Sequence, residues 1–189
     1  MLPPLCARCG APTAWPVERC RECAGRRLAF SRARAAVAYD ADVRRVVRGW
    51  KERGLRSLAA IAAGLVAERL PRPEADVITF VPADRTRRLE RGYHPAEQLA
   101  RALAAAWSVP CEPLLSRRGR SKPQRGLALA ERRRNVARAF LAAAVAGDVL
   151  IVDDVYTSGS TADAAARALR AAGARRAEVV TFARAVRSS

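Results

Sequence analysis

Hydrophobic positions follow two different periods along most of the chain. From residue 34 onward, short apolar runs of the kind found in buried strands alternate with segments whose apolar residues recur every three or four positions, as in amphipathic helices. In segment 41–54, for example, Val43, Val46, Val47 and Trp50 fall on one side of a helix. The pattern predicts strands at 34–40, 76–82, 147–154 and 176–186, and helices at 41–54, 55–70, 94–107 and 161–173.

The order of these elements indicates the class of fold. Strands and helices alternate throughout the second half of the chain, which is typical of a parallel sheet with helices on its faces. The strands at 76–82 and 147–154 are apolar at nearly every position, as expected for strands buried on both faces. We therefore expect an α/β fold whose ligands lie beyond the carboxyl ends of the strands.

The first thirty residues have a different character because they contain four cysteines. Cys6 and Cys9 form one C-x-x-C pair, Cys20 and Cys23 form another, and ten residues separate the two pairs. Each pair can place two thiolates on one tight turn, and together they supply the tetrahedral sulfur site that zinc prefers. Two disulfides are the alternative, but the chain otherwise has the features of a cytoplasmic protein, in which thiols stay reduced. We expect a zinc module at residues 1–30 and a separate domain at 31–189.

Charge narrows the choice of partners. The chain has 35 Lys and Arg against 18 Asp and Glu, a formal net charge of +17 and a pI near 11.4. Such an excess favours polyanions, either nucleic acid or smaller phosphorylated molecules. The sequence contains no run of about 20 apolar residues and starts without a signal sequence, so we expect a cytoplasmic protein with no membrane insertion.

The stretch "VLIVDDVYTSGST", at 149–161, carries the most specific chemistry. Its apolar run predicts a central strand that ends at Asp153 and Asp154, and adjacent carboxylates can accept hydrogen bonds from vicinal hydroxyls or help hold a hydrated divalent cation. Hydroxyl residues around Gly159 then lead into a helix, whose free N–H groups suit a phosphate monoester. Hydroxyls and a phosphate about one sugar apart describe a ribose 5-phosphate.

This stretch has two other interpretations. A nucleotide-binding loop would require a G-x-x-x-x-G-K-[ST] or G-x-G-x-x-G motif, and the sequence has neither. A helix-capping loop that follows two solvated aspartates requires no ligand at all. The occurrence of a hydrophobic strand, an acid pair and a hydroxyl loop in this order favours the sugar phosphate.

These residues also resemble a known family. The stretch 149–161 resembles the 5-phosphoribosyl-1-diphosphate (PRPP) signature of type I phosphoribosyltransferases, and the whole chain resembles the ComF/GntX family of competence-associated, phosphoribosyltransferase-like proteins. Besides the signature and the four-cysteine module, the resemblance rests on "YDADVRRVVRGWKERG", "VPADRTRRLERGYHPAEQLA" and "KPQRGLALAERRRNVARAF". It implies a parallel-sheet, type I phosphoribosyltransferase-like domain at 31–189 that binds PRPP together with Mg²⁺.

The resemblance assigns roles to individual residues. It places Asp153 and Asp154 on the ribose hydroxyls, and with Lys122 they are the catalytic candidates. The 5-phosphate loop that it implies consists of Thr157, Ser158, Gly159, Ser160 and Thr161. The pyrophosphate candidates are Asp84, Arg85, Arg87 and Arg88, together with Arg118, Lys122 and Gln124 from a loop at 116–135 that would close over PRPP.

Two positions outside these motifs are also given a structural prediction. His94 is the only histidine, so a Ser-His-Asp arrangement is not available, and we expect this residue to start a helix. Tyr93-His94-Pro95 replaces the family's common Phe-Asn-Gln, so no side-chain amide contact is carried over. Cys111 has no partner in the sequence and is predicted to be a small buried apolar residue.

Two functions remain open at the level of the sequence. One is a phosphoribosyltransferase of nucleobase or related metabolism, whose acceptor is unidentified. The other, implied by the resemblance, is a PRPP-binding protein of DNA uptake in natural transformation that contacts single-stranded DNA and a DNA-translocating competence helicase. Arginine clusters at 44–48, 85–91, 117–120 and 132–134 are candidate phosphate contacts, and the aromatic residues available for base stacking are Trp15, Trp50, Tyr93 and Trp107.

Overall fold

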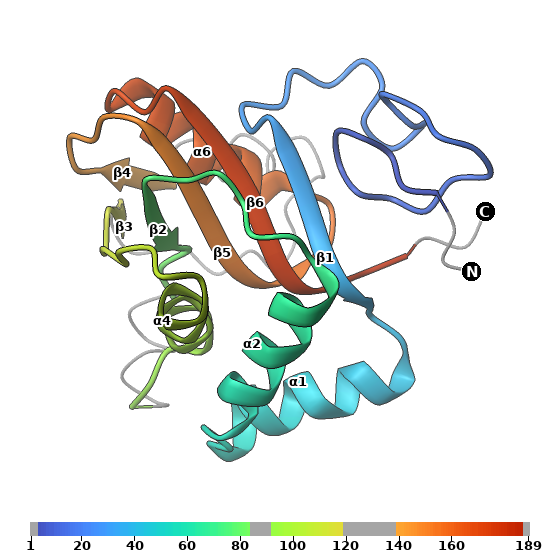
Figure 1. Cartoon of the computed structure of the whole chain (residues 1–189), viewed down its shortest axis with the longest axis vertical. Helices are drawn as coiled ribbons and strands as arrows, with labels where there is room; N and C mark the ends of the chain where they lie inside the picture. The colour runs from blue at the N-terminus through green and yellow to red at the C-terminus, as the bar shows by residue number, and fades with distance from the viewer. Residues whose placement is uncertain (1–3, 84–91, 119–138, 187–189) are drawn as a thin grey trace, which may run out of the picture.

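The computed structural model describes residues 4–83, 92–118 and 139–186 (Figure 1). Their main feature is a parallel sheet with strand order β1-β6-β5-β2, formed by β1 (Arg32–Ala38), β6 (Arg176–Arg184), β5 (Asp148–Tyr156) and β2 (Val77–Phe80). A small antiparallel pair consists of β3 (Leu115–Arg117) and β4 (Phe140–Ala142). The helices are α1 (Ala41–Arg53), α2 (Leu58–Arg69), α4 (Pro95–Trp107) and α6 (Ser160–Ala171).

The predicted parallel-sheet α/β fold is confirmed. Every strand and helix expected from the hydrophobic pattern is present, with ends that differ from the predicted ones by three residues at most. The difference between prediction and structure that matters most for the site is in β5, which was expected to end at the acid pair but continues to Tyr156. It does so because β6 pairs with it beyond this point, with Asp153 opposite Thr181 and Tyr156 opposite Arg184.

The sheet is buried on both faces, as the continuous apolar runs predict. Leu150 and Val152 face one layer, formed mainly by α1, α2 and α4. Val149 and Ile151, which point the other way, pack in a second core with α6 and the cysteine-rich segment. Figure 1 shows α6 on one side of the sheet and α2 and α4 on the other. Among the described residues, no helix has the length and apolar character required to cross a membrane.

The caps of two helices position groups near the carboxyl edge of the sheet. The Asp40 side chain accepts a hydrogen bond of 2.9 Å from the N–H of Val43 at the start of α1. This helix ends at Gly54, which has a φ of 68° and so adopts the left-handed conformation that favours glycine. The predicted role of His94 is confirmed, because its Nδ1 atom caps α4 by accepting from the N–H of Glu97. Lys51 lies in the last turn of α1, close to the end of the helix at Gly54.

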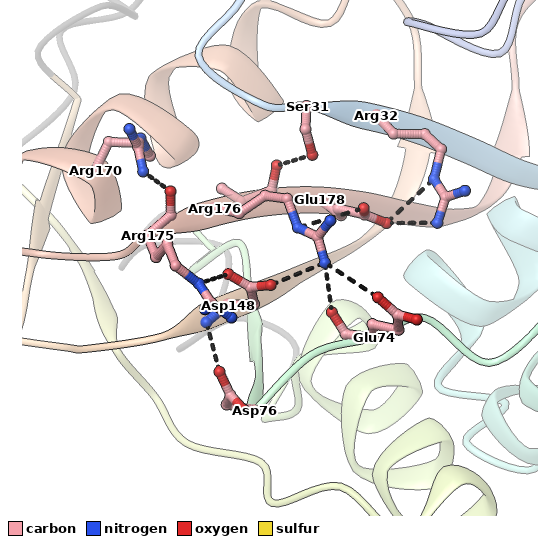
Figure 2. A network of polar contacts seen from close by, with 10 residues as sticks. Ser31, Arg32, Glu74, Asp76, Asp148, Arg170, Arg175, Arg176 and Glu178 are labelled. Atoms are coloured by element: carbon pink, nitrogen blue, oxygen red, sulfur yellow. Dashed lines mark hydrogen bonds and ion pairs between the residues drawn. The ribbon is translucent and has the colours of Figure 1, made fainter.

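Charged residues join the strands at the opposite, amino edge of the sheet (Figure 2). Asp148, at the start of β5, accepts a hydrogen bond of 2.8 Å from Arg175 and forms an ion pair of 2.8 Å with Arg176. The hydrogen bond from Arg175, with help from Arg176, lowers the pKa of Asp148. Its backbone N–H donates to Asp76, and Glu178 continues the network to Arg32 on β1. The network therefore links the strands at the edge of the sheet that lies away from Asp153 and Asp154.

Candidate functional site

The acid pair lies in the part of β5 that extends beyond the end of β2. The last paired residue of β2 is Phe80, opposite Val152, so Asp153 and Asp154 follow immediately after this contact. The Oδ1 atom of Asp153 accepts a hydrogen bond of 2.9 Å from the N–H of Asp154. The Oδ2 atom of Asp154 forms an ion pair of 2.6 Å with the Nζ atom of Lys51. The ammonium group of Lys51, on α1, thus contacts the carboxylate of Asp154 on the face of the sheet that α1 covers.

The surroundings of Asp153 change its protonation. Burial, reinforced by the neighbouring carboxylate of Asp154, raises the pKa of Asp153 to about 8, although Lys51 and Arg117 act in the opposite direction. Asp153 therefore retains its proton at neutral pH. A ligand that supplies hydroxyl donors or brings a cation close by would favour the ionised carboxylate.

This pKa leads to a prediction for stability. The Asp153 carboxyl keeps its proton up to about pH 8 in the folded protein but only up to its ordinary pKa of 3.8 in the unfolded chain. The folded state therefore binds more protons in this interval, and stability falls as the pH rises through it. The Asp153→Asn variant lacks this titrating group. Its free energy of unfolding should therefore exceed that of wild type by about 2 kcal/mol at pH 8, a figure that is lowered to allow for the contact of Asp153 with solvent.

Urea unfolding at several pH values measures this difference. The advantage of the Asp153→Asn variant should disappear near pH 4 and stay constant above pH 8. A variant that is less stable than wild type at pH 8 contradicts the account of the acid pair.

The hydroxyl loop connects β5 to α6. Gly159 has a φ of +73°, and a Cβ atom at this position would overlap the Tyr156 hydroxyl oxygen, so only glycine fits. The hydroxyls of Ser158 and Ser160 are 3.0 Å apart. The N-cap residue of α6 is Gly159, which has no side chain to cap the helix, and the Ser158 hydroxyl accepts only a long hydrogen bond of 3.4 Å from the N–H of Ser160. The loop has the donors that an anion requires.

The structure describes some of the predicted site residues and not others. Asp153 and Asp154 lie on the same strand–loop–helix connection as Thr157, Ser158, Gly159, Ser160 and Thr161. Arg118 is exposed at the end of β3, where its N–H donates to the carbonyl of Ala139. The remaining candidates stay predictions because they lie outside the described residues: Asp84, Arg85, Arg87, Arg88, Lys122 and Gln124.

Two basic residues near the acid pair were given no role in the site predicted from the sequence. Lys51 pairs with Asp154; it lies in the segment "YDADVRRVVRGWKERG", on which the family resemblance partly rests, and is one of two lysines in the chain. Arg117 acts on Asp153 electrostatically, and its Nε atom donates a hydrogen bond of 2.9 Å to the carbonyl of Pro82. Arg117 belongs to the arginine cluster at 117–120, but only its neighbour Arg118 was predicted to contact pyrophosphate.

The four predicted ligand cysteines come together in space. The Sγ atoms of Cys6 and Cys23 are 3.6 Å apart, those of Cys9 and Cys20 are 3.5 Å apart, and all four lie within 4.8 Å of one another. Four sulfurs bound at about 2.3 Å around a tetrahedral ion would be separated by about 3.8 Å. Disulfide sulfurs would be about 2.05 Å apart, and all four cysteines are free. The cluster can therefore hold a structural metal such as zinc.

The surroundings of the thiols shift their pKa values in different directions. Burial raises the pKa of Cys9, and it raises that of Cys23 to about 11. Burial has the same direction at Cys6, but hydrogen bonds from backbone N–H groups outweigh it and lower the pKa to about 7. A bound cation would stabilise the thiolate forms. Cys111, predicted to be buried, is only partly so, because it lies at a single bridge to Ile78 at the margin of the sheet.

The fold and these two clusters define a parallel-sheet α/β protein in which a four-cysteine module accompanies an acidic pair and a hydroxyl loop. No family model matches the chain. It is similar to competence protein F of Haemophilus influenzae, with 27% identity over 96% of this chain and 85% of the relative. It is also similar to the DNA utilization protein YhgH of Salmonella typhi, with 30% identity over 90% of this chain and 79% of the relative. The chain belongs to the ComF family.

Two solved structures also align with part of the chain. One is described as the allosteric regulatory enzyme of purine biosynthesis, with 27% identity and a TM-score of 0.46. The other is the glutamine PRPP amidotransferase from B. subtilis in complex with ADP and GMP, with 28% identity and a TM-score of 0.42. Each alignment covers 67% of this chain but only 25% of the other, so the chain spans about a quarter of their length.

Proposed function

We propose that this protein binds PRPP with Mg²⁺ at the carboxyl end of β5 and acts in DNA uptake during natural transformation. The observation that carries the proposal is the acid pair of Asp153 and Asp154, which the structure joins to the hydroxyl loop at 157–161 through one short connection. Carboxylates suit vicinal ribose hydroxyls, and the start of α6 suits the 5-phosphate. The names of the relatives, competence protein and DNA utilization protein, support the role in DNA uptake.

Each residue then has a defined task. Asp153 and Asp154 accept hydrogen bonds from the ribose hydroxyls, and Lys51 pairs with the Asp154 carboxylate when no ligand is bound. The N–H groups and hydroxyls of 157–161 hold the 5-phosphate. The pyrophosphate contacts remain those predicted from the sequence, namely Asp84, Arg85, Arg87, Arg88, Arg118 and Lys122. Mg²⁺ supplies further neutralisation of the diphosphate when it is bound.

The alternative function is a phosphoribosyltransferase. In that reaction the bond from C1 of the ribose to pyrophosphate breaks, pyrophosphate leaves with the bonding electrons, and the acceptor forms the new bond to C1. Positioned basic groups would stabilise the leaving charge, so no nucleophilic side chain is needed. An open cavity of about 350 Å³ lies at the amino edge beside Asp76, Asp148 and Arg175, away from the acid pair, and so does not supply an acceptor pocket. Steady release of pyrophosphate with a nucleobase would favour this alternative.

Titration calorimetry tests the proposed ligand. PRPP should bind more tightly than ribose 5-phosphate in the presence of Mg²⁺, because its pyrophosphate adds contacts from 84–88 and Lys122. The Lys122→Ala variant should lose affinity for PRPP while its affinity for ribose 5-phosphate stays the same. No heat of binding with PRPP at millimolar concentration contradicts the proposal.

The cysteine cluster is proposed to bind one structural zinc, and residues 1–30 to form the zinc module. Tetrahedral spacing of the sulfurs and the cytoplasmic location that the sequence predicts both favour zinc over disulfides. The cytoplasmic location and a competence helicase as partner remain predictions.

We expect binding to single-stranded DNA with weak sequence preference and strong salt dependence. The exposed side of α1 carries Arg44, Arg45 and Arg48, which can contact phosphates. Of the aromatic residues proposed for stacking, Trp50 and Trp107 are buried and Tyr93 is partly buried, whereas Trp15 is 68% exposed. The affinity should fall by about three orders of magnitude between about 50 and 200 mM salt if several phosphates are contacted. Fluorescence anisotropy with a labelled oligonucleotide measures it, and a flat salt response rejects DNA binding.

A further inference from the structure

The cysteine module lies against the loop that the proposed function assigns to the 5-phosphate. The Nη1 atom of Arg26, three residues after Cys23, donates a hydrogen bond of 2.8 Å to the carbonyl oxygen of Ser158. We propose that Arg26 is a positioning residue that sets the conformation of the phosphate loop, so that the cysteine module is a working part of the ligand site. This inference rests on the proposed function.

The geometry of one peptide bond explains how Arg26 would act. The peptide between Ser158 and Gly159 is trans, so its C=O and its N–H point in opposite directions. Arg26 holds the C=O toward the module, and the N–H of Gly159 is consequently directed away from it. Glycine tolerates positive and negative φ almost equally, so Gly159 alone would allow this peptide to turn over. A restraint from outside the loop is therefore needed to keep the N–H available to an anion.

A second contact reaches the same glycine through Tyr156. Arg184 is 4% exposed, and its guanidinium lies 4.5 Å from the centre of the Tyr156 ring. It also donates a 2.7 Å hydrogen bond to the carbonyl oxygen of Cys9 and forms a 2.8 Å ion pair with Glu22, both in the module. The Tyr156 hydroxyl in turn occupies the space beside Gly159 where a Cβ atom would be. The module, Arg184, Tyr156 and the loop are thus in continuous contact.

A third contact connects the module to the first turn of α6. The N–H of Ala29 donates a hydrogen bond of 2.7 Å to the Asp163 side chain, and Arg167 joins that carboxylate to the carbonyl of Arg27. The position of Arg26 depends on the cluster, because its N–H bonds to the carbonyl of the ligand Cys23. Loss of the metal or oxidation of the thiols should therefore weaken the binding of the 5-phosphate from a distance.

The test compares Arg26→Ala with Arg27→Ala, which removes the same charge from an exposed neighbour. Calorimetry is carried out with ribose 5-phosphate, PRPP and pyrophosphate, and the metal content and melting temperature of each variant are measured. Arg26→Ala should weaken ribose 5-phosphate and PRPP by the same factor, about tenfold, because the lost hydrogen bond acts on the shared phosphate. The affinity for pyrophosphate, the metal content and the melting temperature should not change.

Several outcomes separate this inference from the proposed function. Equal affinities for Arg26→Ala and wild type, or an equal loss in Arg27→Ala, would overturn the role of Arg26. A wild type that binds neither sugar phosphate would overturn the proposed function and this inference with it. If Arg26→Ala fails to fold, Arg26→Lys provides the test, since it keeps the charge and one donor and should retain part of the lost affinity. Full loss in the lysine variant, with its fold intact, overturns the inference.

Discussion

Replacement of both Asp153 and Asp154 by alanine should reduce PRPP affinity at least a hundredfold while the protein remains folded. The two carboxylates are the acceptors proposed for the ribose hydroxyls. Their removal leaves the apolar core intact, since β5 packs through Val149 to Val152. It also relieves the repulsion and burial that raise the pKa of Asp153. Calorimetry with PRPP and Mg²⁺ measures the affinity, and thermal unfolding measures the stability.

A matched control separates this effect from a change in net charge. Asp42 and Glu52 on α1 have side chains that are 79% and 61% exposed, and their replacement by alanine removes the same two negative charges. This control should bind PRPP as wild type does. Equal affinity in the Asp153/Asp154 double variant and wild type rejects the assignment of the acid pair.

Removal of the metal should open residues 4–30 to protease. Regular pairing in this segment amounts to a single bridge between Leu5 and Pro12, and a metal held by the four sulfurs would cross-link its two turns. Because the binding energy of a structural zinc is also folding energy, a chelator should cause cleavage in the module before the sheet domain is attacked. Limited proteolysis with and without chelator measures this, and Cys9→Ser should behave like the chelated protein.

Removal of the metal should also affect the core that the module shares with the sheet. Cys6, Cys9 and Cys23 pack in the same core as Phe30 and Tyr156, so the metal-free protein should also unfold at a lower temperature. Elemental analysis of protein purified under reducing conditions should find one zinc per chain. Absence of metal in that sample, or an unchanged cleavage pattern after chelation, contradicts the zinc assignment.

The sheet and its helices could be predicted because their signals are local and periodic. Val149 to Val152 are apolar at successive positions, which only a strand buried on both faces explains well, and the structure places them in two different cores. The clustering of the four cysteines could also be predicted, because the two cysteines of each pair lie three residues apart in the sequence. The β3–β4 pair was not predicted because strands of three residues are too short for a period to show.

The groups around the acid pair could not be predicted in the same way. Lys51 reaches Asp154 across more than one hundred residues of sequence, and Arg26 reaches Ser158 across 132. Such contacts arise from the packing of α1 and the cysteine module on the sheet, and nothing in the local pattern distinguishes these basic residues from many exposed arginines. The choice of Arg118 shows the same limit, since Arg117 is the neighbour that acts on Asp153.

The acid pair and the hydroxyl loop are proposed to hold the two ends of one sugar phosphate. A crystal structure of the protein grown with saturating PRPP and Mg²⁺ tests this proposal most directly. The ribose hydroxyls should lie within hydrogen-bond distance of Asp153 and Asp154, and the 5-phosphate should lie on the N–H groups of residues 157–161. PRPP bound elsewhere, or a ligand whose phosphate does not contact this loop, would contradict it.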